Sequence, residues 1–408
     1  MLSFNNINSL ISKCCWIILL VCSATICSCS KDDSHEKNKE PSRTVLIYMA
    51  AENSMSPYVQ SDIQEMLAGL SKLGNNDNLV VYVDDTSLPR FYYLNKKTST
   101  VSAKNLVANY TYKSEMNSCS AETLDLVMKH VTDKFKSDTY GIVFWSHGSG
   151  WIEQESNVKR YTFGVDNRKN NANDDAGDQM SIIDMASVLR KYNNLEFVFF
   201  DACFMQSIEV AYELKDCANY ILASPAETPG TGAPYNYIML PMFAKPFYPG
   251  NVLLSIYDYQ LKQDPYGIVV SAIKTSELDN FAKTMKGIFA KHTFLDKDYS
   301  KCLNYYVADE WNQLMVLYHS PDMYDMEGIM KENLDEAEMV EWQDAFDRLV
   351  VSCYATESWY SAFEDGLMTV DGRPCGGVSM FLPFDKYKGE QFYDDYNKTA
   401  WGKLFNIK

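Results

Sequence analysis

Positive charge is scarce in this chain of 408 residues. It has 37 Lys and Arg against 54 Asp and Glu, so the formal net charge at pH 7 is -17. Such a chain would repel a polyanion, which argues against nucleic acid as a partner. A cationic substrate would be attracted, although an acidic surface can equally serve solubility alone. Hydrophobic residues make up 46% of the chain, which excludes wholesale disorder and allows a sizeable core.

The sequence also lacks closely paired cysteines of the kind that hold zinc. Five of the eleven cysteines lie at or before position 29, and the others are Cys119, Cys203, Cys217, Cys302, Cys353 and Cys375. Their spacing is wide and contains no C-x-x-C motif, so a metal site built from cysteine is not expected. If Cys203 stays a free thiol, an odd number remains, and we predict no specific disulfide.

A long hydrophobic run is missing at the N-terminus, where the apolar segment Trp16–Ile26 is too short for a membrane-spanning helix of about 20 residues. It follows the cation Lys13, as in a cleaved signal peptide. We therefore expect residues 1–28 to be a signal peptide and residues 29–42 a polar tether.

The end of this signal resembles a bacterial lipobox. Cys29 fits the lipidated position because the small residue Ser28 precedes it, whereas bulky Ile26 before Cys27 fits poorly. The segment Ser30–Asp33 resembles the acidic signal that directs some lipoproteins to the outer surface. We expect an exported protein, lipid-anchored at Cys29 in the outer membrane and facing the cell exterior. An ordinary secretory signal with incidental cysteines is the alternative.

Strand and helix signals alternate from Arg43 to Ser224. This pattern predicts parallel pairing and a three-layer α/β/α sandwich around a mostly parallel sheet. The expected strands include Arg43–Ala51, Asn78–Asp84, Phe91–Leu94 and Tyr220–Ser224, and the expected helices include Pro57–Leu73, Ala121–Phe135 and Ser181–Tyr192. We assign residues 43–240 to a core and residues 241–408 to a C-terminal part that completes or flanks it.

Residues 241–408 give weaker secondary-structure signals. Gly267–Ile273 and Cys375–Pro383 read as strands, while Leu278–Phe289 and the segment from Glu332 to Tyr354 read as helices. No linker marks a second domain.

The segment Ile152–Gln179 is expected to be a long polar loop, and loops of that length tend to be functional. Asn171, Asn173 and Asp175 suggest a calcium loop. The EF-hand pattern fails there, however, because Ala176 holds the position of the glycine. No cofactor or metal is predicted, and calcium stays a weakly supported alternative.

Two apolar segments end abruptly in polar chemistry. Tyr140–Trp151 carries His147, and Glu196–Met205 carries Cys203. Parallel strands would bring both side chains to one rim of the sheet, and a thiol beside an imidazole is the minimum for cysteine nucleophilic catalysis. The backbone N–H groups of Gly148 and Cys203 would form an oxyanion hole. The helix after Cys203 would favour its thiolate. Taken singly, however, a buried cysteine is often only a small hydrophobe.

These motifs resemble one family. Ser146–Trp151 followed by Asp201–Met205 is similar to the clostripain family of cysteine peptidases, which groups with the caspases. Tyr48–Asn53 with Asp62–Met66 resembles the first strand and helix of that family, and Ser224–Gly232 resembles the segment after a later strand. The resemblance implies a caspase-like sandwich with extra C-terminal elements, a His–Cys dyad and cleavage of proteins or peptides after basic P1 residues.

The resemblance also implies roles for other residues. Asp201, two positions before the cysteine, would lie in the pocket for the basic side chain, unless it merely caps the following helix. Some members place a second acid in a later loop, where this chain has Glu227 and Thr231. Members can be activated by cleavage after a basic residue, and Lys159 and Arg160 are the candidates here.

A different class of function stays open. The chain could be a surface lipoprotein that keeps the peptidase fold without catalysis and binds peptide or glycan through its aromatics, 28 Tyr, 20 Phe and 7 Trp. Core packing explains such residues more simply.

Overall fold

The computed structural model describes residues 42–152, 162–263, 266–306, 321–362 and 366–405. The expected signal peptide, most of the tether, the lipidation residue Cys29 and the processing residues Lys159 and Arg160 lie outside these ranges. The compact unit runs from Pro41 to Lys408. Within the described residues, no helix combines the length and the apolar character needed to cross a membrane.

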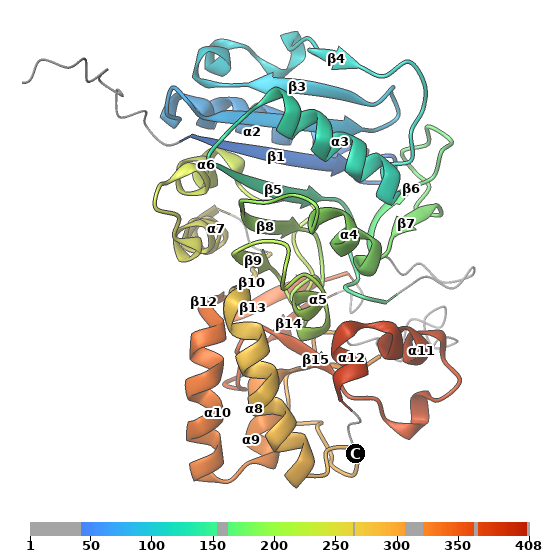
Figure 1. Cartoon of the computed structure of the whole chain (residues 1–408), viewed down its shortest axis with the longest axis vertical. Coiled ribbons are helices and arrows are strands. Elements are labelled where there is room, and N and C mark those ends of the chain that lie inside the picture. The colour runs from blue at the N-terminus through green and yellow to red at the C-terminus, as the bar shows by residue number, and fades with distance from the viewer. Residues whose placement is uncertain (1–41, 153–161, 264–265, 307–320, 363–365, 406–408) are drawn as a thin grey trace, which may run out of the picture. The chain divides into compact units, whose positions relative to one another are not determined.

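A nine-stranded sheet organises this unit (Figure 1). Its order is β12-β10-β9-β8-β5-β1-β2-β3-β4. The five central strands, from β9 to β2, pair in parallel, and the strands at both edges pair antiparallel. The strands are β1 (Arg43–Ala50), β2 (Asn78–Asp84), β3 (Arg90–Leu94), β4 (Tyr110–Thr111), β5 (Thr139–Trp145), β8 (Leu195–Asp201), β9 (Tyr220–Ala223), β10 (Val269–Lys274) and β12 (Val350–Ala355).

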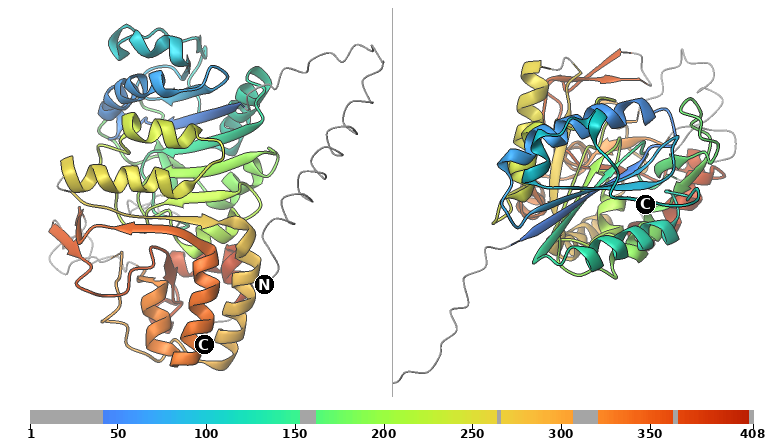
Figure 2. Two further views of the ribbon diagram at one scale, coloured as in Figure 1. Left: turned by 90° about the vertical axis from the view of Figure 1, so that its left-hand side faces the viewer. Right: turned by 90° about the horizontal axis from the view of Figure 1, so that it is seen from above.

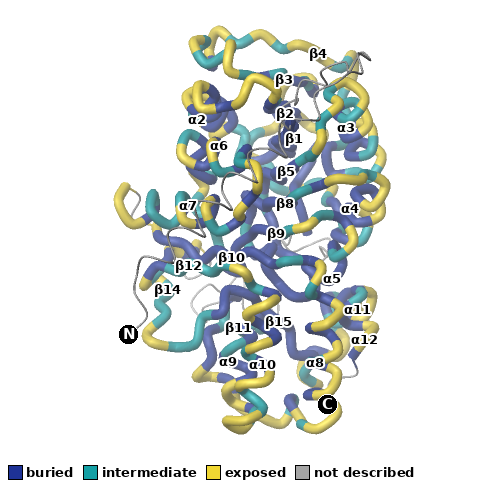
Figure 3. Tube along the Cα trace, turned by 60° about the vertical axis from the view of Figure 1, so that its left-hand side comes forward, coloured by how far each residue is buried: buried dark blue, intermediate teal, exposed yellow. Residues whose placement is uncertain are grey.

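The central strands are apolar on both faces because helices cover both faces. In β1, Val45, Ile47 and Met49 join one hydrophobic cluster, while Leu46 and Tyr48 join the other. The tube in Figure 3 shows these strands buried along their length. The sequence prediction of a mostly parallel sheet inside a three-layer sandwich is confirmed.

Helices lie on both sides of the sheet (Figure 2). Residues of α2, α6 and α7 join the cluster on one face, and residues of α3, α4 and α5 join the cluster on the other. The helices are α2 (Val59–Gly69), α3 (Ala121–Lys134), α4 (Ile182–Leu189), α5 (Ile208–Glu213), α6 (Tyr235–Phe243), α7 (Pro249–Gln263), α8 (Leu278–Lys291), α9 (Met326–Asn333), α10 (Glu336–Leu349), α11 (Gln391–Lys398) and α12 (Ala400–Leu404).

Short antiparallel pairs complete the fold. They are β6 (Phe163–Asp166) with β7 (Asp178–Met180), β11 (Met323–Asp325) with β15 (Ser379–Phe381), and β13 (Ser358–Ser361) with β14 (Gly366–Thr369). Residues beyond 241 also supply β10 and β12 to the main sheet. The sequence therefore continues one sheet past the boundary that we placed at residue 240.

Two expectations about elements are wrong in part. The expected loop Ile152–Gln179 contains most of the β6–β7 hairpin. Its buried apolar residues Phe163 and Val165 are too few, among many Asn and Asp residues, to give the alternating pattern of a strand. The expected helix from Glu332 to Tyr354 ends at Leu349, and β12 follows at once. No Gly or Pro separates the two elements, so the sequence gives no sign of the boundary.

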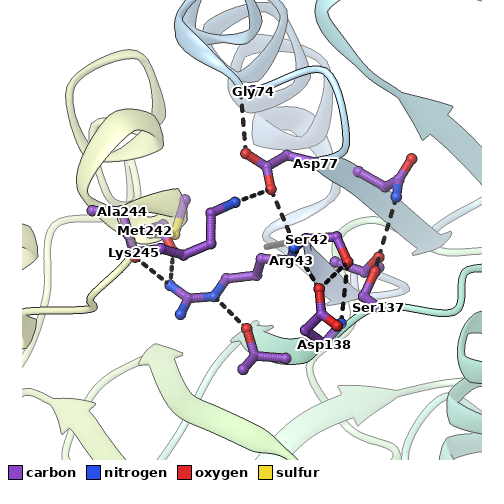
Figure 4. Close-up of polar contacts among 12 residues, drawn as sticks. Ser42, Arg43, Gly74, Asp77, Ser137, Asp138, Met242, Ala244 and Lys245 are labelled. Carbon is purple, nitrogen blue, oxygen red and sulfur yellow. Dashed lines mark hydrogen bonds and ion pairs between the residues drawn. The ribbon is translucent and has the colours of Figure 1, made fainter. Parts of the chain in front are cut away.

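A closed polar network holds the amino end of β1 (Figure 4). Arg43 is buried. Its Nη1 donates to the carbonyl oxygen of Met242 (2.8 Å), in the last turn of α6, and to that of Ala244 (3.0 Å), which directly follows the helix. Asp77 accepts a hydrogen bond from the Arg43 N–H (3.0 Å) and forms an ion pair with Lys245. Buried charges are tolerated here because each one has a partner.

Candidate functional site

The two candidate catalytic residues follow neighbouring strands. β5 and β8 pair in parallel with Trp145 opposite Asp201, and His147 and Cys203 each lie two residues farther on. Gly148 fits closely against the cysteine turn, because a Cβ at this position would lie 2.6 Å from the Cys203 carbonyl oxygen. The structure thus brings the segments that carry the imidazole and the thiol together at the carboxyl rim of the sheet.

His147 is held by two groups that lie outside its own motif. Its Nε2 lies 2.9 Å from the Ser54 hydroxyl and 3.5 Å from Asp175 Oδ1, while the Ser54 N–H donates to the same Asp175 oxygen at 2.8 Å. Burial opposes ionisation of Asp175, but its hydrogen bonds with His147 and Ser54 prevail and hold its pKa below the usual range. Asp175 therefore provides a carboxylate that can orient the imidazole.

The Cys203 thiol contacts the loop after β9. Within the described residues its hydrogen-bond partner is Thr228, whose N–H lies 3.3 Å and whose hydroxyl lies 3.6 Å from Sγ. Burial, together with the Glu227 carboxylate, raises the pKa of the Cys203 thiol to about 11 although the Thr228 N–H opposes this. The cysteine is thus a neutral thiol here and needs a base before it can attack.

The expected help from a helix dipole is not found. α5 begins at Ile208 with Ser207 as its N-cap, so Cys203 lies outside the first helical turn, where the dipole acts. Instead, the turn is held open by Phe204, which has a φ of 61° in the left-handed region. The Phe204 N–H donates to the Ala226 carbonyl at 2.9 Å. This hydrogen bond fixes the strained turn against the loop that follows β9.

The backbone around Gly148 leaves its amide available for an oxyanion. Gly148 and Phe163 form an antiparallel bridge, whose two hydrogen bonds join Ser149 to Thr162 and Gly164 to His147. This pattern uses the residues on either side of Gly148 and not its own N–H. An oxyanion hole of the Gly148 and Cys203 amides stays a prediction that this geometry permits.

Asp201 lies at the end of β8 and binds the segment that leads into α6. Its carboxylate accepts hydrogen bonds from the Ala233 N–H (3.0 Å) and the Tyr235 hydroxyl (2.8 Å), so it does not cap α5. Burial raises the Asp201 pKa to about 6. A narrow cavity is lined by Asp201, Thr228 and Gly232, among other residues. The Asp201 carboxylate therefore lies near Thr228, the residue that contacts the Cys203 thiol.

Two further acids, which come from α2 and which the sequence reading missed, lie near Gly232 and the segment that leads into α6. A Cβ at Gly232 would lie 2.9 Å from Asp62 Oδ2 and 3.2 Å from Asp201 Oδ2, so both carboxylates face this glycine. Burial, with repulsion from Asp201, raises the pKa of Asp62 to about 8. Glu65 accepts the Tyr235 N–H at 3.0 Å. The acids come from a distant part of the chain, so only their place in the family-like segment Asp62–Met66 could have signalled them.

The other predicted substrate residues, Glu227 and Thr231, lie in the loop between β9 and α6. Glu227 accepts a hydrogen bond from the Ala362 N–H at 2.9 Å, and Thr231 is exposed. A wider pocket opens at the amino ends of the strands, where Thr139, Leu195 and Asn219 are among its lining residues. None of the candidate catalytic residues lines that pocket.

The suggested calcium loop is closed by its own hydrogen bonds. Asn173 and Asp174 donate their N–H groups to Asn171, and Asp175 faces His147. The six cysteines among the described residues are all free thiols.

Comparison with known proteins gives consistent matches. A sequence model of the clostripain family matches residues 47–406. Clostripain of Hathewaya histolytica is 26% identical over 224 residues, which cover 50% of this chain and 42% of clostripain, so the match spans less than half of that relative.

Two solved structures match with a TM-score of 0.73, and each covers 89% of this chain. One is a secreted C11 cysteine protease from Bacteroides thetaiotaomicron in complex with an irreversible peptide inhibitor, at 27% identity over 98% of that chain. The other is an inactive zymogen of a C11 protease from Parabacteroides distasonis, at 28% identity over 97% of that chain. They share the caspase-like fold that the sequence motifs imply.

Proposed function

Because this chain belongs to the clostripain family of cysteine peptidases, we propose that it hydrolyses peptide bonds after Arg or Lys with Cys203 and His147 as its dyad. The observation that carries the proposal is the placement of both residues two positions past paired residues of β5 and β8. Asp201, one of those paired residues, adds an acid beside the thiol's partner Thr228.

The proposed reaction starts from a protonated thiol. His147 takes the proton of Cys203 as the sulfur attacks the scissile carbonyl, and the Gly148 and Cys203 amides receive the oxyanion. The imidazolium then protonates the leaving amine, which leaves an acyl-enzyme that water hydrolyses. Asp175 stabilises the imidazolium because its carboxylate stays ionised beside the ring.

Selection of a basic side chain follows from the acids near Gly232. A substrate Arg or Lys that opens this cavity, whose volume is about 10 Å³, would meet the Asp201 carboxylate, and its positive charge would favour ionisation of Asp62, which faces the same glycine. A charged partner on the substrate offsets the cost of ionising these buried acids.

A substrate library varied at P1 tests the proposal. Wild-type protein should cleave after Arg and Lys, and Cys203→Ala should leave every substrate intact. An arginyl or lysyl acyloxymethyl ketone should label wild type at Cys203 and should not label the variant. Lack of labelling, with Arg and Lys substrates untouched, would instead favour the binding lipoprotein.

The tryptophans do not favour that alternative. The five tryptophans in the described part of the chain pack in the core, and they are Trp145, Trp151, Trp342, Trp359 and Trp401. They do not form a surface for glycan or peptide.

Processing is part of the proposal. The neighbouring zymogen supports activation by cleavage, and Lys159 and Arg160 are the basic residues that the proposed specificity would recognise. Purified wild type should then appear as two fragments and Cys203→Ala as one chain. Nicking that persists in Cys203→Ala would rule out self-processing.

The proposed location is the outer membrane, reached through a lipid on Cys29. The lipobox-like sequence supports lipidation, and the secreted neighbour supports export. Wild type should sediment with membranes and incorporate labelled palmitate, whereas Cys29→Ala should do neither. Recovery of unlipidated wild type in the medium would refute the anchor.

A further inference from the structure

A glutamine interrupts the buried apolar face of α7. The buried residues of this helix recur at helical spacing, and they are Pro249, Val252, Leu253, Ile256 and Gln260. The first four are apolar, as expected for a helix face that packs against a sheet. Gln260 is also buried, with only 3% of its surface exposed. Its amide therefore lies where the helical period calls for an apolar side chain.

The oxygen of this amide does not help to hold the fold together. Gln260 Oε1 has no hydrogen-bond partner among the described residues. A buried acceptor without a partner destabilises the folded state. Of the buried side chains with an unpartnered polar atom in the described chain, Gln260 alone lines the cavity that Asp201 and Thr228 share. The oxygen therefore points to a hydrogen-bond donor that a ligand brings into this cavity.

The cavity connects Gln260 to the candidate site. Asp201 and Thr228 line it at the carboxyl rim of the sheet, while Gln260 and Ile256 line it from α7. Thr228 contacts the Cys203 thiol through its N–H at 3.3 Å. Most of the other lining residues are apolar. A side chain that widens the cavity would therefore meet the Asp201 carboxylate and the Gln260 amide in one largely apolar enclosure.

The Asp201 carboxylate is already partly occupied by the protein itself. Both of its oxygens lie 3.0 Å from the Ala233 nitrogen, and Oδ2 also accepts the Tyr235 hydroxyl at 2.8 Å. A guanidinium presents five N–H donors, whereas an ammonium presents three. Donors left unpaired in an apolar enclosure are costly to bury. An arginine in this cavity would therefore need a further acceptor more than a lysine would.

We propose that Gln260 is a specificity residue, which accepts a hydrogen bond from a substrate arginine and so favours Arg over Lys at P1. The inference rests on the proposed peptidase function and goes further, because it names the preferred basic side chain and the residue that selects it. Asp201 supplies negative charge, which attracts Arg and Lys alike. Gln260 supplies a neutral acceptor, which stabilises most the side chain that still has unpaired donors.

Two substitutions at Gln260 test the role of its oxygen. Gln260→Leu removes the acceptor, and because Oε1 has no partner in the free protein, this variant should fold and melt no lower than wild type. Its kcat/KM for an Arg substrate should fall by about tenfold or more, whereas that for the matched Lys substrate should change by less than about threefold. Gln260→Glu keeps an oxygen acceptor and should retain the wild-type ratio of Arg to Lys cleavage within about threefold.

Gln263→Leu is the matched control, because Gln263 belongs to the same helix but is exposed and donates to the Tyr237 hydroxyl. It should leave kcat/KM for both substrates unchanged. The inference is overturned if wild type favours Lys, if Gln260→Leu keeps the wild-type ratio of Arg to Lys, or if this variant loses melting temperature and both activities together, as after loss of a structural contact. If wild type cleaves after neither residue, the proposed function itself fails, and this inference fails with it.

Discussion

Asp175 shows how a residue from a distant loop can come to face the imidazole. It belongs to a loop that the sequence offers only as polar, yet its carboxylate lies 3.5 Å from His147 Nε2. In the proposed reaction, a carboxylate that stays ionised there would fix the orientation of the ring and stabilise its protonated form during proton transfer. Asp175 would act through His147 in that reaction, which would make it a positioning residue and not a catalytic one.

Replacing this carboxylate should slow turnover more than it weakens binding. We expect Asp175→Asn to lower kcat by about 10- to 100-fold with KM within threefold, because orientation and charge at His147 are lost. Asp174→Asn is the control, since Asp174 pairs with Lys169 at the surface and should leave kcat unchanged. Steady-state kinetics on an Arg substrate measures both. An equal loss in both variants would show that the loop matters only as a whole.

The pKa of Asp201 predicts how the activity should depend on pH. Its carboxyl has a pKa of about 6, so it ionises as the pH rises through that value, and under the proposed specificity it would attract a basic side chain only above that pH. The ratio of kcat/KM for an Arg substrate to that for a citrulline substrate should rise through about pH 6, because the general base His147 affects both substrates alike. Asp201→Asn should remove this rise and reduce kcat/KM for Arg by about 100-fold. An unchanged profile in the variant would assign the pocket to another acid.

At the scale of elements, the β6–β7 hairpin supports the histidine turn. Gly164 donates its N–H to the His147 carbonyl at 2.9 Å and has a φ of 74°. A Cβ at this position would lie 2.7 Å from Cys119 Sγ. Both the backbone conformation and the lack of space require glycine here.

Gly164→Ala should therefore destabilise the fold and disturb the site together. Gly372 offers a matched control, because it also has a positive φ (69°) but nothing within 4 Å of an added Cβ. Urea denaturation should show a loss for Gly164→Ala that exceeds that of Gly372→Ala by about 1–2 kcal/mol. Turnover should fall only in the Gly164 variant. Equal losses would mean that Cys119 moves aside and that the contact is unimportant.

The elements that the sequence predicts well are those with a strong local signature. The strands before His147 and Cys203 are continuous apolar runs, and parallel pairing then places both residues at one rim. The hairpin that holds Gly164 has only a few apolar residues and gives no such signature. Asp62 and Asp175 join the candidate site from other elements, so no local pattern connects them to it.

At the scale of the whole molecule, several buried charged residues lie near the two ends of the sheet. At the amino end, Arg43, Asp77 and Lys245 neutralise one another (Figure 4). At the carboxyl end, Asp62 and Asp84 are carboxyls without a basic partner in the described chain, and burial raises their pKa values to about 8 and 9. The rim that carries the candidate site is therefore the end where the fold tolerates uncompensated acid.

This asymmetry fixes the sign of the pH dependence of stability. Above pH 4 the folded chain holds protons that the unfolded chain has released: on Asp201 up to about pH 6, on Asp62 up to about pH 8 and on Asp84 up to about pH 9. The free energy of unfolding therefore falls as the pH rises from 4 to 9. The melting temperature, measured in EDTA, should be lower at pH 9 than at pH 5. Asp62→Asn keeps an acceptor for the Trp145 N–H and cannot ionise, so it should lose less stability over this range. Asp258→Asn, at an exposed pair with Lys262, should follow wild type. A melting temperature for wild type that is flat or rises from pH 5 to pH 9 would mean that these acids are ionised in the folded chain and that a partner compensates them.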